Sequence, residues 1–139
     1  MAIVYLDTSA LVKLVVDEPG SALAAALWDG ADLVVTSRLA DAEVRAVLAG
    51  GRRAGRLDDE AAQDATEAWD RLWPGLHVLE LLPEVTAAAA ALVDLHPLRA
   101  ADALHLASAL ELRSPDLVVA VWDEHLAAAA RAEGLHVVP

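Results

Sequence analysis

"LVVAVW", residues 117–122, is an unbroken apolar run rich in valine, and Asp123 follows it directly. A short run of this kind predicts a strand that is buried on both faces of a sheet. The segment "AIVYL", residues 2–6, has the same character and is followed by Asp7. Helical patterns come after both strands, which favours an α/β fold in which helices cover both faces of a parallel sheet.

Strands and helices alternate along the rest of the chain. Further strands are expected at 32–36, 77–81 and 136–138. Helical periodicity, with caps and breakers at its ends, predicts helices at 9–16, 21–28, 37–49, 58–73, 84–95, 99–112 and 124–133. Gly50-Gly51 is expected to end the helix that begins at Ser37. Without linkers or repeats, the pattern predicts one α/β domain over residues 1–139 with a central, mostly parallel sheet.

Composition favours a folded chain in a reducing compartment. Hydrophobic residues make up 57% of the 139 residues, which argues against disorder. The absence of cysteine excludes disulfides, thiolate zinc sites and thiol catalysis. The first residues lack the basic region of a signal peptide, and no apolar run reaches the roughly 18 residues of a membrane span. We therefore expect a cytoplasmic protein with no membrane partner.

The charge balance is acidic, with one basic region. The net charge is −12, and an acidic mean field repels nucleic acids. Five of the ten Lys and Arg residues nevertheless fall within one short segment: Arg38, Arg45, Arg52, Arg53 and Arg56. This basic segment can be interpreted either as solvated surface arginines or as a binding region.

Two aspartates stand at the carboxyl ends of predicted strands. Asp7 follows the strand 2–6, and Asp123 follows the strand 117–122. Open parallel sheets bind ligands along this edge, so both side chains are candidate site residues. Each also precedes a helix, and aspartate is a common N-cap, so a purely structural role is an equal alternative.

Two further carboxylates lie on predicted helices, beside their apolar faces. Glu43 shares a helix face with Leu39 and Val47, while Asp102 lies one turn into an apolar helix, three residues before His105. Buried carboxylates are costly unless they are paired or bound to a metal. The alternatives are a helix-dipole contact or a hydrogen bond to His105 for Asp102, and a satisfied core position for His105.

The four carboxylates together indicate a metal site. If they converge on one pocket, they cannot all remain ionised without a countercharge. Arg45 is the only basic residue expected beside any of them, so a divalent cation is the simplest countercharge. Mg²⁺ and Mn²⁺ accept oxygen ligands and can activate water for attack on a phosphate.

At its two ends, the chain resembles the PIN-domain nucleases, and among them the VapC-type toxins of bacterial toxin–antitoxin pairs. "VYLDTSALVKL" is similar to the opening strand of that family, with its first acid at Asp7 and the hydroxyls of Thr8 and Ser9 beside it. "VVAVWDEHLAAAARAEGLHVV" is similar to the closing strand, with the last acid at Asp123.

The middle of the chain carries the same resemblance. "ADAEVRAVLA" is similar to the helix of the second acid, at Glu43, and "LRAADALHLASAL" to the helix of the third acid, at Asp102, next to His105. The four segments occur in the family's order and span nearly the whole chain. One departure is Val121, where many relatives carry a Thr or Ser whose hydroxyl supports the last acid.

The resemblance implies a three-layer αβα sandwich and a Mg²⁺- or Mn²⁺-dependent endoribonuclease that cleaves RNA phosphodiester bonds as a toxin. It implies that the catalytic, metal-binding residues are Asp7, Glu43, Asp102 and Asp123, supported by Thr8, Ser9 and His105. The implied partners are an RNA substrate, with tRNA and rRNA as candidates, a VapB-type antitoxin and a second copy of the chain. The homodimer can assemble further with the antitoxin.

With a metal in the pocket, the basic segment gains a possible role, because its arginines could hold phosphates beside the metal. We expect Arg45 to lie near the pocket. Arg52, Arg53 and Arg56 could instead receive an antitoxin segment.

Three other functions are weighed against the nuclease. A haloacid-dehalogenase-like phosphatase needs a second Asp two residues after the first, where Ser9 stands. A response-regulator receiver needs an acidic pair and a Lys after a late strand, whereas Lys13 is the only lysine. The third alternative is a catalytically silent PIN-like binding or scaffold module, which the intact set of acids disfavours.

Overall fold

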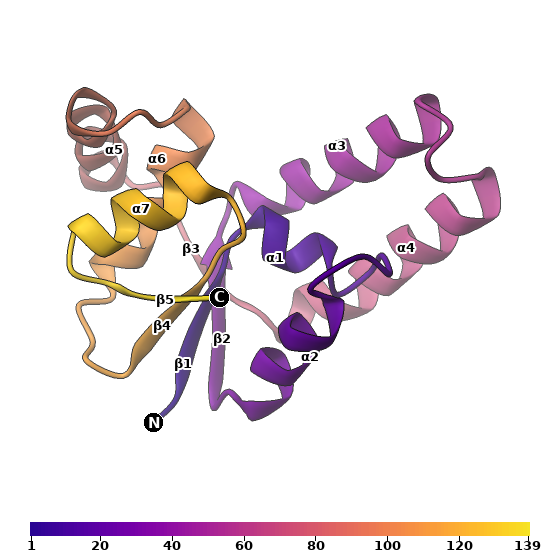
Figure 1. Cartoon of the computed structure of the whole chain (residues 1–139), viewed down its shortest axis with the longest axis horizontal. Helices are drawn as coiled ribbons and strands as arrows, with labels where there is room; N and C mark the ends of the chain where they lie inside the picture. Colours follow the sequence, from indigo (N-terminus) through magenta and orange to yellow (C-terminus); the bar gives the residue numbers. More distant parts are fainter.

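The computed structural model, which describes residues 1–139, contains a parallel sheet of five strands between two layers of helices (Figure 1). The strands are β1 (Ile3–Leu6), β2 (Leu33–Ser37), β3 (His77–Leu79), β4 (Leu117–Ala120) and β5 (His136–Val138). Their order in the sheet is β3-β2-β1-β4-β5, and every neighbouring pair is parallel. The predicted α/β class with three layers is confirmed.

Seven α-helices connect the strands. They are α1 (Thr8–Val12), α2 (Ser21–Gly30), α3 (Ala40–Arg53), α4 (Asp59–Leu72), α5 (Pro83–Leu95), α6 (Ala100–Glu111) and α7 (Glu124–Ala132), with a 3₁₀ turn, η1 (Trp73–Gly75), after α4. In Figure 1, α5, α6 and α7 cover one face of the sheet, and α1 to α4 lie on the other side. The helices α3 and α4 form a hairpin that projects from the sheet. No helix has the length and apolar character needed to cross a membrane.

The central strand β1 supplies side chains to two separate cores. Ile3 and Tyr5 pack into the core beneath α5, α6 and α7, whereas Val4 and Leu6 pack into the core formed with α1, α3 and α4. Successive side chains of a strand point to opposite faces, so both faces of β1 are buried. This explains why the strand is a continuous apolar run rather than an alternating one.

The side of the sheet on which new strands are added changes at β1. The chain adds β2 and β3 on one side of β1, and then crosses over to add β4 and β5 on the other. Parallel sheets bind ligands beyond the carboxyl ends of their strands at such a reversal. Because β1 and β4 are neighbours in register, the residues after Leu6 and Ala120 meet at this point.

Gly50-Gly51 does not end α3, which was a wrong prediction. The helix continues to Arg53, and Gly51 is buried where an added Cβ would lie 3.2 Å from Leu57 Cδ1. The actual stop is Gly55, with φ +75, which follows the last turn in a left-handed conformation. The N–H groups of Gly55 and Arg56 then donate to the carbonyls of Arg52 and Gly51 at 3.1 and 2.9 Å.

The first helix is shorter than expected. A helix was predicted over residues 9–16, but α1 ends at Val12 and the chain continues in turns. Here the N–H groups of Leu14 and Val15 donate to carbonyls three residues earlier, at 3.0 and 3.1 Å. This tightening leads the chain into the loop before α2, which reaches Gly20 with φ +94.

Candidate active site

One pocket at the carboxyl ends of β1 and β4 brings the four candidate acids together. Its volume is about 340 Å³, and we call it the acid pocket. Its lining residues are Asp7, Thr8, Ser9, Val12, Lys13, Glu18, Glu43, Val47, Arg99, Asp102, His105 and Asp123. The acids arrive from four different elements, because Asp7 follows β1, Glu43 lies on α3, Asp102 lies on α6 and Asp123 precedes α7.

Asp7 and Asp123 are helix caps and pocket residues at once. Asp7 Oδ1 accepts hydrogen bonds from Ala10 N at 3.0 Å and from Ser9 Oγ at 2.6 Å. Asp123 Oδ1 accepts from Leu126 N at 2.8 Å. In both residues the cap uses Oδ1, and Oδ2 accepts no hydrogen bond within the chain. The two interpretations of these residues are therefore compatible, because one oxygen caps a helix and the other remains available to a ligand.

Asp7 is the most buried of the acids, at 4% exposed. Burial raises the pKa of its carboxyl, although the hydrogen bonds from Ser9 and Ala10 and the nearby His105 act in the opposite direction. No buried side-chain oxygen or nitrogen lacks a hydrogen-bond partner. Oδ2 of Asp7 has no partner within the chain and so retains some exposure, in a residue that lines the acid pocket. A cation there would favour the ionised carboxylate.

Glu43 is held by a chain of hydrogen bonds that leads into the core. Its Oε1 accepts from Thr8 Oγ1 at 2.6 Å and lies 2.6 Å from His105 Nε2. His105 is buried at 2% exposed, and its Nδ1 lies 2.8 Å from the hydroxyl of Tyr5. When Nε2–H donates to Glu43, Nδ1 of the neutral ring is free to accept from Tyr5. His105 thus connects the carboxylate to the buried face of β1.

The surroundings of Glu43 favour its ionised form. Burial opposes ionisation, but the hydrogen bonds from His105 and Thr8, together with the favourable electrostatics of His105 and Arg99, outweigh it and lower the pKa of the carboxyl. Glu43 and Asp7 lie in one pocket, yet their pKa values are shifted in opposite directions. The difference arises because Asp7 is more deeply buried and Glu43 has a histidine partner.

Two cations in the acid pocket were missed by the sequence analysis, which expected only Arg45 there. Arg99 Nε lies 3.5 Å from Asp102 Oδ2, and Lys13 Nζ lies 3.0 Å from Glu18 Oε1. The spacing of Arg99 and Asp102, three residues apart at the start of a helix, was a signal that could have revealed the first pair. The local sequence pattern did not predict that Lys13 lies in the acid pocket, because a helix was expected over residues 9–16 and α1 ends at Val12.

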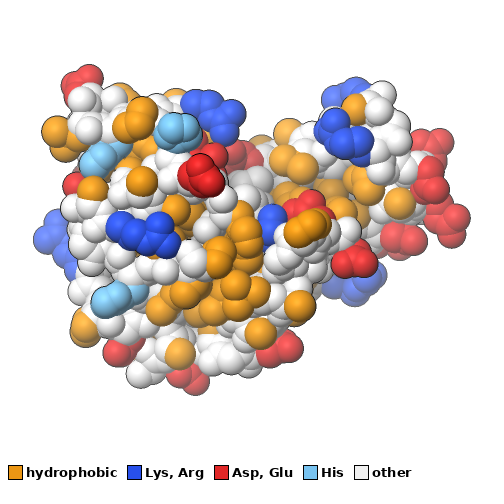
Figure 2. Space-filling view, in the orientation of Figure 1, with side chains coloured by type: hydrophobic (Ala, Val, Ile, Leu, Met, Phe, Trp, Pro, Cys, Tyr) orange, Lys and Arg blue, Asp and Glu red, His pale blue; other side chains and the backbone are white.

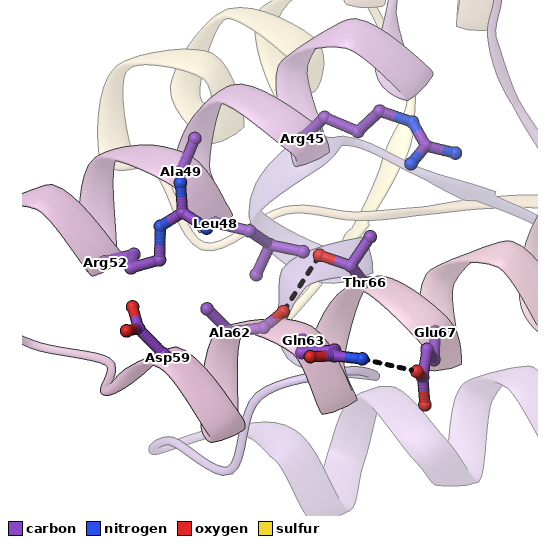
Figure 3. A pocket seen from close by; sticks show the side chains of 9 residues that line it. All are labelled: Arg45, Leu48, Ala49, Arg52, Asp59, Ala62, Gln63, Thr66 and Glu67. Atoms are coloured by element: carbon purple, nitrogen blue, oxygen red, sulfur yellow. Dashed lines mark hydrogen bonds between the residues drawn. The ribbon is translucent and has the colours of Figure 1, made fainter.

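The arginines of the basic segment do not line the acid pocket, so the expectation for Arg45 was wrong. Arg45 belongs to a groove of about 550 Å³ between α3 and α4, shown in Figure 3, which we call the hairpin groove. Its guanidinium donates to Asp41 Oδ1 at 3.0 Å and to Asp70 Oδ1 at 2.6 Å. Because Arg45 is two residues from Glu43, the helix turns it away from the acids.

The other four arginines lie outside the acid pocket as well. Arg38 donates to Glu80 Oε2 at 3.1 Å, and Arg52 lines the hairpin groove. Arg53 and Arg56 are exposed at the end of the α3–α4 hairpin. Figure 2 shows Lys and Arg side chains gathered at that end, beside acidic side chains along α4. A role for these arginines in holding phosphates directly beside the acids has no support in this geometry.

Val121 lies behind the acid pocket, against a void of about 10 Å³ that Tyr5, Asp7 and His105 also line. Its side chain is buried and brings no hydroxyl to this position. Asp123 thus accepts no hydroxyl hydrogen bond, whereas Asp7 accepts one from Ser9, whose Oγ also lies 3.4 Å from Trp122 N. Ser9 therefore joins the ends of β1 and β4 on the pocket side.

The donor set of the acid pocket suits a hydrated divalent cation. No group of three or more His, Asp or Glu side chains is close enough to enclose a metal ion. Mg²⁺, however, commonly binds through one or two carboxylates and keeps several waters, so it does not require a closed cage. The four acids offer carboxylate oxygens around one open pocket, which is the chemistry that such an ion accepts.

Comparisons with known proteins concern nearly the whole chain. The family model described as the PIN domain matches residues 4–132. Ribonuclease VapC45 of Mycobacterium tuberculosis is 48% identical over 139 residues, which cover 100% of this chain and 96% of that relative. The matched span includes the four candidate acids, Asp7, Glu43, Asp102 and Asp123.

Solved structures share the fold at lower identity. The crystal structure of VapC20 from Mycobacterium tuberculosis, described as a sarcin–ricin loop cleaving toxin, has a TM-score of 0.69 and 20% identity, and the match covers 91% of this chain and 94% of that chain. A toxin–antitoxin complex from Klebsiella pneumoniae has a TM-score of 0.67 and 18% identity, with 100% and 97% coverage. These similarities agree with the three-layer arrangement of Figure 1.

Proposed function

This chain belongs to the PIN-domain family, and on that premise we propose that it is a VapC-type endoribonuclease toxin whose acid pocket binds a divalent metal and cleaves RNA phosphodiester bonds. The observation that carries the proposal is the meeting of Asp7, Glu43, Asp102 and Asp123 in one pocket. The identity of 48% over the full length to a named ribonuclease supports the same reaction.

The metal ligands in this proposal are Asp7, Glu43, Asp102 and Asp123, and the ion is Mg²⁺ or Mn²⁺. When bound, the ion supplies an activated water and stabilises the charge that develops on the phosphate. The free Oδ2 atoms of Asp7 and Asp123 are the oxygens that the helix caps leave available.

The other polar residues of the pocket orient these acids. Thr8 and His105 hold Oε1 of Glu43, and Ser9 holds Oδ1 of Asp7. Each contact fixes one oxygen of a carboxylate and so directs the other. Positioning partners of this kind are typically worth about 10- to 100-fold in metal affinity or activity. Because Nε2 of His105 is occupied by Glu43, we assign His105 to positioning rather than to general base catalysis.

The proposed partners follow from the VapC relatives. They are an RNA substrate, with tRNA and rRNA as candidates, a VapB-type antitoxin that blocks the acid pocket, and a second copy of the chain. The antitoxin proposal is supported by the shared fold with a chain of a solved toxin–antitoxin complex. The setting we propose is the cytoplasm, where such RNA substrates are found.

The test of the nuclease is cleavage of tRNA and total RNA by the antitoxin-free protein. We expect discrete products with Mg²⁺ or Mn²⁺, none with EDTA, and none from Asp102→Asn. The matched control is Asp59→Asn, which also changes an acid in the first turn of a helix but lies outside the acid pocket. Equal cleavage by Asp102→Asn and the wild type would contradict the proposed site.

Metal binding has its own readout in thermal unfolding. A ligand at about 100 times its Kd stabilises the folded state by about 2.7 kcal/mol. For a chain of this size we expect a rise in Tm of several degrees with saturating Mg²⁺ or Mn²⁺, and a smaller rise for Asp102→Asn. An unchanged Tm and no cleavage of any RNA would instead favour a silent binding module.

A further inference from the structure

Lys13 is a cation held rigidly in the wall of the acid pocket. Its side chain is 11% exposed, its Nζ lies 3.0 Å from Glu18 Oε1, and the ammonium stands 4.9 Å from the ring centroid of Trp122. The loop before α2 closes over it at Gly20, where an added Cβ would lie 2.8 Å from Lys13 Cε. Only a glycine lets the loop pass so close, and the ammonium therefore has little freedom to leave the pocket.

The ammonium retains capacity to bind an anion. A lysine ammonium has three N–H donors, and within the chain Lys13 has one hydrogen-bond partner, Glu18. The acid pocket contains five carboxylates and two cations, Lys13 and Arg99. The side chain of Arg99 is 84% exposed, so Lys13 is the only cation whose position the fold constrains.

An RNA phosphate that approaches these carboxylates is repelled unless cations receive it. A metal would compensate the charge of the acids themselves, while a fixed ammonium on the wall can pair with a phosphate oxygen at the side. The arginines of the basic segment do not serve here, because none of them lines the acid pocket. Lys13 lies on the wall formed by α1 and the loop after it, and Arg99 approaches from α6.

We propose that Lys13 binds a phosphate oxygen of the RNA backbone at the wall of the acid pocket and so positions the strand for cleavage. This inference rests on the proposed ribonuclease function and adds a substrate-binding residue to it. The competing role for Lys13 is structural, in which its ion pair and its contact with Trp122 only hold the loop before α2 in place.

Two variants distinguish phosphate binding by Lys13 from a purely structural role of its ion pair. Lys13→Met removes the charge but keeps an unbranched side chain to pack against Trp122. Glu18→Gln breaks the same ion pair but leaves the cation in the pocket. A structural role predicts similar losses for both variants, whereas a phosphate contact predicts a loss of RNA binding only for Lys13→Met. Lys13→Arg, which keeps the charge, is expected to retain most of the binding.

The measurement is binding of a single-stranded RNA to the full-length protein carrying Asp102→Asn, at a series of salt concentrations with Mg²⁺. The logarithm of the RNA-binding constant decreases linearly with the logarithm of the salt concentration. The magnitude of this slope becomes smaller by about 0.7 for each RNA phosphate that the protein ceases to neutralise. We expect this smaller slope, with several-fold weaker binding, for Lys13→Met. For Glu18→Gln we expect an unchanged slope and binding at least as tight as that of the parent, because one repelling carboxylate is gone. Unfolding curves of each variant provide the structural readout.

Several outcomes would overturn the inference. Equal slopes for the parent and Lys13→Met would do so, as would matching losses of binding and of Tm for Lys13→Met and Glu18→Gln. If Lys13→Met does not fold, the comparison of Lys13→Gln with Lys13→Arg replaces it, with the same expected difference in slope. If the wild-type protein cleaves RNA but Lys13→Met binds RNA with full affinity, only this inference is overturned. If the wild-type protein neither binds nor cleaves RNA, the proposed function is overturned as well.

Discussion

The acid pocket and the hairpin groove, of about 340 and 550 Å³, are two polar concavities that the chain builds in opposite ways. The hairpin groove lies between helices that are consecutive in sequence, and Arg45 there is paired with two carboxylates of α3 and α4. The acid pocket draws its carboxylates from positions as distant as Asp7 and Asp123. It has an excess of acids, which its two cations do not balance.

The difference shows where unbalanced charge accumulates in this fold. Neighbouring helices can match their exposed charges pairwise, as Arg45 does with Asp41 and Asp70. Arg53 and Arg56 of the basic segment face solvent. At the carboxyl ends of β1 and β4, the backbone forces acids of separate elements together, and a ligand is needed to compensate them. We therefore expect changes in the acid pocket to alter activity strongly, and changes in the hairpin groove to have little effect.

The largest effect is expected for Asp7→Asn. This change should lower RNA cleavage by at least about a hundredfold, because it removes the charge of the most buried proposed ligand. The metal-free Tm should not fall at neutral pH, since the Asn oxygen can still cap α1. Cleavage kinetics and unfolding in EDTA measure the two effects.

Asp58→Asn is the control for Asp7→Asn. Asp58 caps α4 through a hydrogen bond of 2.7 Å from Ala61 N, but it lies outside the acid pocket. It should leave cleavage unchanged. If both variants lose Tm to a similar extent and both still cleave RNA, Asp7 acts only as a helix cap.

The next effect is expected for His105→Ala, which removes the partner of Glu43 and the 2.8 Å contact of His105 with the buried hydroxyl of Tyr5. A buried polar group without a partner costs about 1–3 kcal/mol of unfolding free energy. Cleavage should fall by about 10- to 100-fold, because Glu43 loses its orientation. His125→Ala, at an exposed position on α7, is the control for both readouts. A stable His105→Ala variant with full activity would show that Glu43 needs no such support.

A smaller effect is the pH dependence of stability in metal-free buffer. Burial raises the pKa of Asp7 in the folded state above that of the unfolded chain, so the folded state holds this proton more tightly. The contribution of Asp7 to stability is thus fully present below the unfolded pKa and is lost as the pH rises through the folded pKa. The Tm of Asp7→Asn relative to wild type should rise across that interval and then level off. A difference that does not change with pH would indicate that Asp7 stays ionised throughout.

The smallest effect is expected for Arg45→Ala in the hairpin groove. Exposed ion pairs contribute about 0–1 kcal/mol, and Arg45 is 43% exposed. RNA cleavage should stay at the wild-type level, because Arg45 does not line the acid pocket. A loss of cleavage comparable to that of Asp7→Asn, with Tm unchanged, would restore the expectation that Arg45 lies near the site.

The fold was predictable from the sequence to the level of its layers. The apolar runs of β1 and β4 indicate burial on both faces, which a parallel sheet covered by two helical layers provides. The end of α3 was not predictable from Gly50-Gly51, because a glycine inside a helix is tolerated where a side chain such as Leu57 packs against it. The length of α1 depended on the loop that closes over Lys13, which no local pattern reveals.

For the candidate site, the sequence indicated the acids but not their environment. Residues that follow the carboxyl ends of strands have a known place at the sheet edge. Asp7, directly after β1, and Asp123, three residues after β4, could therefore be located without coordinates. The pairing of Glu43 with His105 joins residues on α3 and α6, and sequence spacing carries no information about such a contact. Arg45 was misplaced for the same reason, since proximity to Glu43 along a helix does not mean the same face.

By itself, the sequence determined the alternation of strands and helices, the strand ends that carry acids and the identity of the donor groups, since these depend on local periodicity and residue chemistry. Only the tertiary structure decided which oxygen of each carboxylate is free, how burial and His105 shift the pKa values of Asp7 and Glu43 in opposite directions, and which cations enter the acid pocket. Those properties depend on distances between elements far apart in the chain, and the packing of the two helical layers against the sheet sets those distances.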